Sequence, residues 1–216
     1  HPNQKVPGSN QTILEAANSL LSYANDVSMK EPRLKPVSSD NMKKELEFRI
    51  GIFFGSDKPL VKLVNGLGSD AAAGGGILAI RPDANFNEKD VDVFDVHEAQ
   101  VHLLAEINAH KQPWCLWLQQ ISPRTEGTQE GLATFVEFVS GATYSKRMQK
   151  IANRVIGIDM ILTGRKTFVE MFQWHKEICK MDDESAYNST ARIFAGSLGN
   201  SDGLPFTRDI SYLKNM

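Results

Sequence analysis

The segment NEKDVDVFDVHEAQVHLLAEINAH, residues 87–110, is the part of the chain from which the rest can be interpreted. Asn87 is a helix-capping residue type, and Asp90 three positions later gives a pattern close to a capping box. No proline follows this cap until Pro113. Because proline breaks the interior of a helix, we predict one long helix that runs from this cap and ends before Pro113.

A metal-binding pattern lies inside that helix. Residues 97–102 read HEAQVH, which is HExxxH, one residue longer than the HExxH of common zinc proteases. In a regular α-helix, residues five positions apart point about 140° apart around the axis, so His97 and His102 would diverge from a shared ion. A π-type turn absorbs the extra residue and brings both rings to one face. We therefore predict such a turn between about Val96 and Leu103.

A third ligand has to come from another segment, because a catalytic zinc site normally has three protein ligands and one open position. Glu130, within TQEGLA at residues 128–133, is the best candidate. We predict a loop over residues 121–127 and a helix capped by Thr128, with Glu130 in its first turn, folded back against the first helix. Such a His₂Glu set is hydrolytic, and Glu98 beside it is a general base for a metal-activated water.

These side chains also have simpler interpretations. HExxxH arises by chance in a chain of this composition on the order of one time in a hundred, and a histidine on an amphipathic helix is more often a surface or core residue. His110 and His175 have no comparable partners, and we interpret both as structural. Glu137 shares a helix face with Glu130. It is either a carboxylate that orients a ligating histidine or a solvated glutamate.

The remaining chain predicts an α+β, mostly helical fold with a small sheet. ILAIRP at residues 77–82 reads as a strand with an open edge, to which an extended peptide could add, and AAAGGG at 71–76 reads as a hinge. We predict a single domain over residues 1–216, with an N-terminal helical lobe at 1–76 and a catalytic core at 77–216. Besides the helix from Asn87, we expect helices at 10–26, 40–54, 129–140, 145–163, 167–179 and 184–196.

Composition narrows the function classes. The 216 residues carry a net charge of −2, which gives no electrostatic basis for binding nucleic acid or an anionic membrane. No apolar run approaches the roughly 20 residues that span a bilayer. The two cysteines, Cys115 and Cys179, form no disulfide framework, which is typical of a reducing compartment, so we expect a cytoplasmic protein. The chain begins at His1 rather than Met, so a removed signal peptide is an open alternative.

At HEAQVH followed by TQEGLA, the sequence resembles the flavohemoglobin expression-modulating QEGLA-motif proteins and the related microtubule-associated tyrosine carboxypeptidases. The resemblance runs from about Ile77 to Met216 and includes KIANRVIGIDM, TARIFAG and FTRDISYLK in the same order, whereas residues 1–76 match loosely. It implies a zincin-like metallopeptidase with an HExxxH active-site helix. It also implies one Zn²⁺ per chain held by His97, His102 and Glu130, with Glu98 as the catalytic base.

The same resemblance implies a substrate site in the closing segments. It places Tyr212 near the substrate as a catalytic residue. It also places three substrate-binding residues there: Arg192, Arg208 and Lys214. A carboxypeptidase needs a cation for the free α-carboxylate and a donor for the oxyanion. Arg192 suits the first role and Tyr212 the second. The chain departs from the family at Ala109 and Ala195, which leaves a tyrosine-type specificity open.

These observations together predict a zinc carboxypeptidase that hydrolyses the C-terminal bond of a peptide or protein, with no nucleic-acid or membrane partner. Two alternatives stay open. One is another zinc metallohydrolase, either an endopeptidase or an amidase. The other is a non-catalytic metal-binding regulator.

Overall fold

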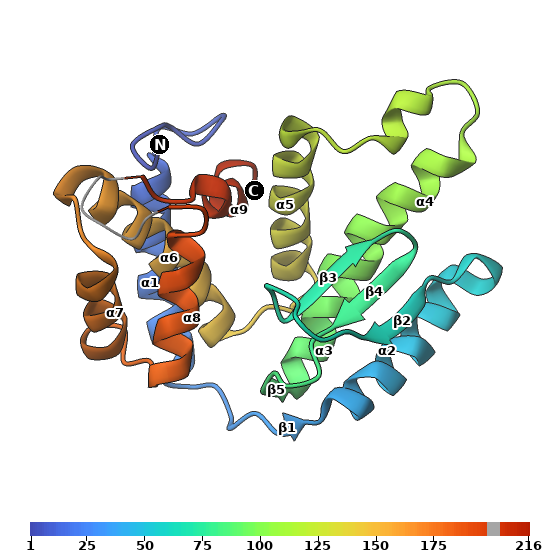
Figure 1. Cartoon of the computed structure of the whole chain (residues 1–216), viewed down its shortest axis with the longest axis horizontal. Helices are drawn as coiled ribbons and strands as arrows, with labels where there is room; N and C mark the ends of the chain where they lie inside the picture. The colour runs from blue at the N-terminus through green and yellow to red at the C-terminus, as the bar shows by residue number, and fades with distance from the viewer. Residues whose placement is uncertain (198–203) are drawn as a thin grey trace. The chain divides into compact units, whose positions relative to one another are not determined.

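The computed structural model describes residues 1–197 and 204–216, which belong to two units (Figure 1). The helical unit combines residues 1–31 with 145–216, and the mixed unit is the continuous segment 32–144. The predicted boundary at residue 76 does not coincide with this division. It falls inside the mixed unit, and the first helix of the predicted N-terminal lobe belongs with the C-terminal helices. The α+β, mostly helical class with small sheets is confirmed.

The mixed unit contains all the described strands. Its elements in chain order are β1 (Pro36–Val37), α2 (Ser39–Phe54), η1 (Gly55–Asp57), β2 (Leu60–Leu63), β3 (Ala71–Gly74), β4 (Ile77–Ile80), β5 (Phe86–Asn87), α3 (Glu88–Phe94), the π-helix η2 (Asp95–Leu103), α4 (Leu104–Lys111), the short η3 (Leu116–Gln119) and α5 (Pro123–Val139). β1 and β5 form a two-stranded antiparallel pair, and β2, β4 and β3 form a three-stranded sheet in that order.

The three-stranded sheet corrects two predictions. β4 confirms the strand at 77–82, but it is the central strand, with β2 parallel on one side and β3 antiparallel on the other. The prediction that its edge is open for a peptide is therefore wrong. The predicted hinge at 71–76 is also wrong in its first part, because Ala71–Gly74 is strand β3. Alanine and glycine have low strand propensity, and pairing with β4 overrides that preference.

The helix from Asn87 has the predicted cap and the predicted distortion. The Asn87 side chain accepts hydrogen bonds from the backbone of Lys89 and Asp90, and the Asp90 carboxylate accepts from the Asn87 backbone. The chain then continues through α3, η2 and α4 as one green helix in Figure 1. The π-type turn predicted between about Val96 and Leu103 is confirmed, because η2 covers Asp95–Leu103.

The start of α5 differs from the prediction. Ser122, not Thr128, is the N-cap: its hydroxyl accepts from the Thr125 backbone, and Pro123 occupies the first turn. Proline is well tolerated there because the first-turn N–H groups have no partner inside the helix. Residues 123–127 are thus helical rather than a loop. Glu130 consequently lies two turns into α5 rather than in its first turn.

The core of the mixed unit holds the π-helix in place. Ala99 and Leu103 of η2 are fully buried in a cluster with Leu46 of α2 and Leu78 of β4. The strands β3 and β4 contact η2 on this apolar side, and α5 also packs against η2. Burying a leucine-sized side chain contributes roughly 1.5–3 kcal/mol, so this cluster fixes how η2 is rotated.

The helical unit consists of α1 (Ile13–Ser28), α6 (Ser145–Gly164), α7 (Phe168–Glu177), α8 (Asp183–Ile193), η4 (Thr207–Ile210) and α9 (Ser211–Lys214). The helices predicted in these regions are confirmed. α1 packs along α6, and a second core cluster joins Ile13, Ile158 and Met171 with Ile193 of α8. Over the described residues, none of the helices is both long and apolar enough to cross a membrane.

Candidate metal centre

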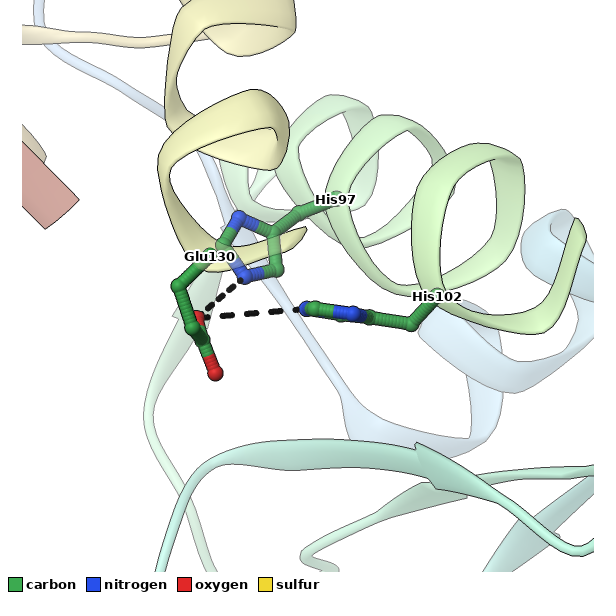
Figure 2. Close-up of side chains that lie close together, drawn as sticks. All are labelled: His97, His102 and Glu130. Atoms are coloured by element: carbon green, nitrogen blue, oxygen red, sulfur yellow. Dashed lines mark ion pairs between the residues drawn. The ribbon is translucent and has the colours of Figure 1, made fainter. Parts of the chain in front are cut away.

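Two elements of the mixed unit bring three potential ligands together. His97 and His102 project from η2, and Glu130 projects from the neighbouring α5. Figure 2 shows both imidazoles directed toward the Glu130 carboxylate. One ligand atom from each residue can be chosen so that all of these atoms lie within 4.8 Å of one another. The π-helix permits this meeting, since the ring centroids of the two histidines are 5.0 Å apart despite their i, i+5 spacing.

The distances suit a shared ion. Glu130 Oε2 lies 3.4 Å from His97 Nε2 and 3.9 Å from His102 Nε2. Zinc in a tetrahedral site, with ligands at 2.0–2.2 Å, holds donor atoms about 3.4 Å from one another. Two imidazole nitrogens and one carboxylate oxygen are also the donor types of a hydrolytic zinc site. The group formed by His97, His102 and Glu130 could therefore bind a metal ion.

The centre is enclosed on one side. His97 and Glu130 are buried, whereas the side chain of His102 keeps 16% of its surface exposed. A buried carboxylate is costly unless a cation or hydrogen-bond donors compensate it. A cation shared with the two Nε2 atoms would compensate the Glu130 carboxylate.

Glu137 settles an alternative that the sequence left open. Its carboxylate is fully buried and accepts a hydrogen bond from His97 Nδ1–H at 2.6 Å. The solvated interpretation of Glu137 is therefore wrong, and it is a carboxylate that orients a candidate ligand. The hydrogen bond occupies the Nδ1 side of the ring, so Nε2 is the atom directed at Glu130.

Sequence reasoning missed the matching contact of the other histidine. His102 Nδ1–H donates to Gln129 Oε1 at 3.1 Å. Gln129 directly precedes Glu130, and a signal was available in its adjacency to the candidate ligand within TQEGLA. A second missed contact lies on η2 itself, where Gln100 donates to Asp95 across the π-turn and Arg49 of α2 pairs with the same carboxylate.

Glu98 follows His97 on η2 and is half-buried. Within residues 1–197 and 204–216, its carboxylate makes no hydrogen bond and no ion pair. It is thus positioned on the same helix as two candidate ligands and retains the capacity to accept a proton.

The candidate substrate residues belong to the helical unit. The Arg192 guanidinium donates twice to the buried Asp209 carboxylate at 2.7 Å and once to the Tyr212 hydroxyl at 3.3 Å. Arg154 is a second buried cation, 3.3 Å from Asp209. Burial raises the pKa of Asp209, but the charges of Arg154 and Arg192 outweigh it and hold the pKa below its ordinary value. Sequence reasoning missed both Asp209 and Arg154.

The other two candidate substrate residues lie in the C-terminal elements of the helical unit. Arg208 lies in η4 and is exposed, and Lys214 ends α9 and is half-buried. The metal-binding group belongs wholly to the mixed unit, whereas Arg192, Arg208, Tyr212 and Lys214 all belong to the helical unit. The roles of these four residues in binding substrate therefore remain proposals.

The remaining predicted histidines behave as structural residues. His175 is fully buried on α7 and donates from Nδ1–H to the Thr190 hydroxyl at 2.8 Å. Burial lowers the pKa of His175 to about 4, so the ring is neutral at physiological pH. His110 is exposed and bonds to the Glu106 carbonyl one turn earlier. Neither belongs to a metal-binding group of described residues.

Comparison with known proteins agrees with the resemblance seen in the sequence. No curated protein matches the chain. The family model of the microtubule-associated tyrosine carboxypeptidases matches residues 1–216, so the match includes the first 76 residues, where the resemblance was loose. Membership in a carboxypeptidase family indicates a peptidase of carboxypeptidase-like activity. Because the match covers the whole chain, the protein belongs to the microtubule-associated tyrosine carboxypeptidase family.

Proposed function

We propose that the protein is a zinc carboxypeptidase that hydrolyses the C-terminal peptide bond of a peptide or protein. The observation that carries the proposal is the meeting of His97 Nε2, His102 Nε2 and the Glu130 carboxylate in one largely buried group. The family match supports the peptidase class. We include in the proposal a zincin-like fold and one Zn²⁺ per chain, with the two units acting as a single metallopeptidase domain over residues 1–216.

The three candidate ligands leave one coordination position for chemistry. A zinc ion bound there would act as a Lewis acid on the scissile carbonyl and lower the pKa of a water. His97, His102 and Glu130 would hold the ion. The partly exposed His102 leaves this side of the centre accessible to solvent.

Glu98 is the proposed general base. Its carboxylate takes a proton from the attacking water and then transfers it to the departing amine, so that the C–N bond breaks with a neutral leaving group. The position of Glu98 beside His97 on η2 supports this role. The lack of a competing hydrogen bond within the described residues leaves its carboxylate oxygens available for that proton.

The helical unit supplies the proposed substrate-binding residues. A free α-carboxylate is best bound by a guanidinium or ammonium group, which we assign to Arg192, Arg208 and Lys214. Asp209 holds the Arg192 guanidinium in a fixed orientation through two hydrogen bonds. Tyr212 is the proposed donor to the oxyanion. The adjacent Arg192 charge supports this role, since a nearby cation makes a phenol a stronger hydrogen-bond donor.

A carboxypeptidase is distinguished from other metallohydrolases by its need for a free C-terminus. We would incubate the zinc-loaded protein with peptides that differ only in ending as the free acid or the amide, including peptides that end in tyrosine. We expect release of the last residue from the free acids and little cleavage of the amides. Equal cleavage of both forms would indicate an endopeptidase or amidase, and cleavage of neither would favour a non-catalytic regulator.

The family name is that of a tyrosine carboxypeptidase, and the same peptide set tests whether a preference for C-terminal tyrosine extends to this chain. Peptides that end in tyrosine and in other residues would be compared by kcat/KM. We also place the activity in the cytoplasm, which is supported by two unpaired cysteines, Cys115 and Cys179.

A further inference from the structure

We infer that Gln129 and Glu137 are positioning residues, each of which fixes the tautomer and orientation of one histidine of the metal centre. This inference rests on the proposed metal-binding function. Gln129 faces His102 and Glu137 faces His97, and both residues lie on α5 together with the candidate ligand Glu130. One helix would thus supply one ligand and the partners of the other two.

The chemistry of the two acceptors determines which nitrogen carries the proton. A neutral imidazole has one N–H donor and one lone pair, and the partner of one nitrogen decides the state of the other. An amide oxygen and a carboxylate only accept, so the bonds to Gln129 and Glu137 require a hydrogen on each Nδ1. Both Nε2 atoms then have their lone pairs directed at the Glu130 side, which is the state that binds a metal.

Helix geometry explains how a single helix reaches both rings. Glu137 lies seven residues after Glu130, about two turns along the same helix face, and Gln129 immediately precedes Glu130. The earlier residue on α5 meets the later histidine on η2, and the later residue meets the earlier histidine. The two helices therefore run antiparallel where they touch, and Glu130 lies between the two supporting contacts.

The two supports differ in strength. Glu137 is fully buried and its bond to His97 is 2.6 Å long, whereas Gln129 is half-buried and its bond to His102 is 3.1 Å long. His97 is thus the more rigidly oriented ligand, and His102, on the more exposed side, is oriented by a neutral amide.

The test measures metal affinity and tautomers rather than turnover. Metal-free full-length protein would be titrated with zinc against a chromophoric chelator for the wild type, Gln129→Leu, Gln129→Glu and Glu137→Gln. Loss of such an outer contact typically costs 10- to 100-fold in metal affinity, which we expect for Gln129→Leu. Glu137→Gln keeps an acceptor for His97 Nδ1–H and should cost clearly less. Gln129→Glu retains an acceptor and should keep the affinity of the wild type. Gln120→Leu and Glu47→Gln change exposed residues and serve as matched controls.

Nitrogen NMR of the histidine rings supplies a second measurement on metal-free protein. We expect the Nδ1–H form for His97 and His102 in the wild type, and loss of that preference at His102 alone in Gln129→Leu. A thermal melt would confirm that each variant is folded. Zinc affinity in folded Gln129→Leu equal to that of the wild type, or an Nε2–H form of His102 in the wild type, would overturn the inference. Failure of the wild type to bind zinc would instead overturn the proposed function.

Discussion

The proposed chemistry depends on Glu98 more than on any other residue. The binding of the metal does not depend on it, because Glu98 is not one of the three candidate ligands. It lies between two candidate ligands on η2, and its half-buried carboxylate makes no hydrogen bond and no ion pair within the described residues. Replacing it with glutamine preserves the shape of the side chain and removes its ability to accept a proton.

Glu98→Gln is therefore expected to keep its zinc and to lose roughly 10²- to 10⁴-fold in kcat, the usual contribution of a general base. Zinc content and steady-state cleavage of a free-acid peptide would be measured on the same preparation. Glu47→Gln, an exposed substitution on α2, is the matched control. Full activity in Glu98→Gln would show that another group takes the proton.

His175 links the stability of the helical unit to pH. Its ring is buried, and burial lowers its pKa from 6.5 to about 4. Below pH 6.5 the His175 ring is protonated in the unfolded chain, whereas in the folded chain it stays neutral until the pH approaches about 4. The contribution of His175 to stability is therefore complete above pH 6.5 and is lost as the pH falls from there toward 4.

Between pH 7 and pH 5 this linkage should lower the free energy of unfolding by about 2 kcal/mol. Urea unfolding at both pH values would measure the decrease in the wild type and in His175→Gln, which has no group that titrates in this range. We expect a clearly smaller decrease in the variant. Equal decreases in the two proteins would mean that His175 is not the group responsible.

At the scale of elements, the π-helix η2 is what turns an HExxxH sequence into a shared site. Its apolar side is held by the core of the mixed unit, where Leu103 is fully buried, whereas the adjacent Leu104 is half-buried. Changing each of these two leucines to alanine alters helix propensity equally. A difference in stability between the two variants therefore reports the contribution of core packing.

Leu103→Ala should lower the free energy of unfolding by roughly 2–5 kcal/mol, because it leaves a cavity in a close-packed core. Leu104→Ala should cost clearly less. Denaturant unfolding of both variants would give the comparison. If the two variants lost the same stability, the core would not be anchoring η2 through Leu103.

The elements that were predictable from sequence are those with local signals. The cap at Asn87 is local, and the π-turn follows from requiring His97 and His102 to share an ion. Strand β3 and the start of α5 were missed for physical reasons. The residues 71–74 have no strand propensity of their own and are ordered by pairing with β4. Ser122 and Pro123 are equally good residues for a loop and for a helix start.

Local sequence signals were also sufficient for only part of the metal centre. Residue type and spacing were enough to select His97, His102 and Glu130, which the structure brings together. The partner of each histidine depends on how two helices are rotated against each other, and that rotation is set by core packing rather than by any local motif. Gln129 was missed for this reason, and Glu137 was left undecided.

At the scale of the whole molecule, the chain leaves the helical unit after Glu31 and returns to it at Ser145. The described hydrogen-bond partners of the two candidate histidine ligands, and the core cluster that holds η2, lie within the continuous segment between these points. The helical unit, by contrast, is assembled from two separate pieces of chain.

A fragment of residues 32–144 is therefore expected to fold and to bind zinc without the helical unit. Circular dichroism and a zinc titration against a chelator would compare the fragment with the full chain, and a fragment carrying His102→Ala would be the control. A folded fragment without measurable zinc affinity would show that the metal centre needs residues outside 32–144.

The proposed activity depends on His97, His102 and Glu130 holding one zinc ion together. The most direct measurement is the metal content of protein that has been stripped with a chelator, reloaded with zinc and dialysed. The wild type and Glu98→Gln should each retain about one zinc per chain, whereas His102→Ala and Glu130→Ala should retain far less. A wild type that takes up no zinc, or ligand variants that retain as much zinc as the wild type, would contradict this account.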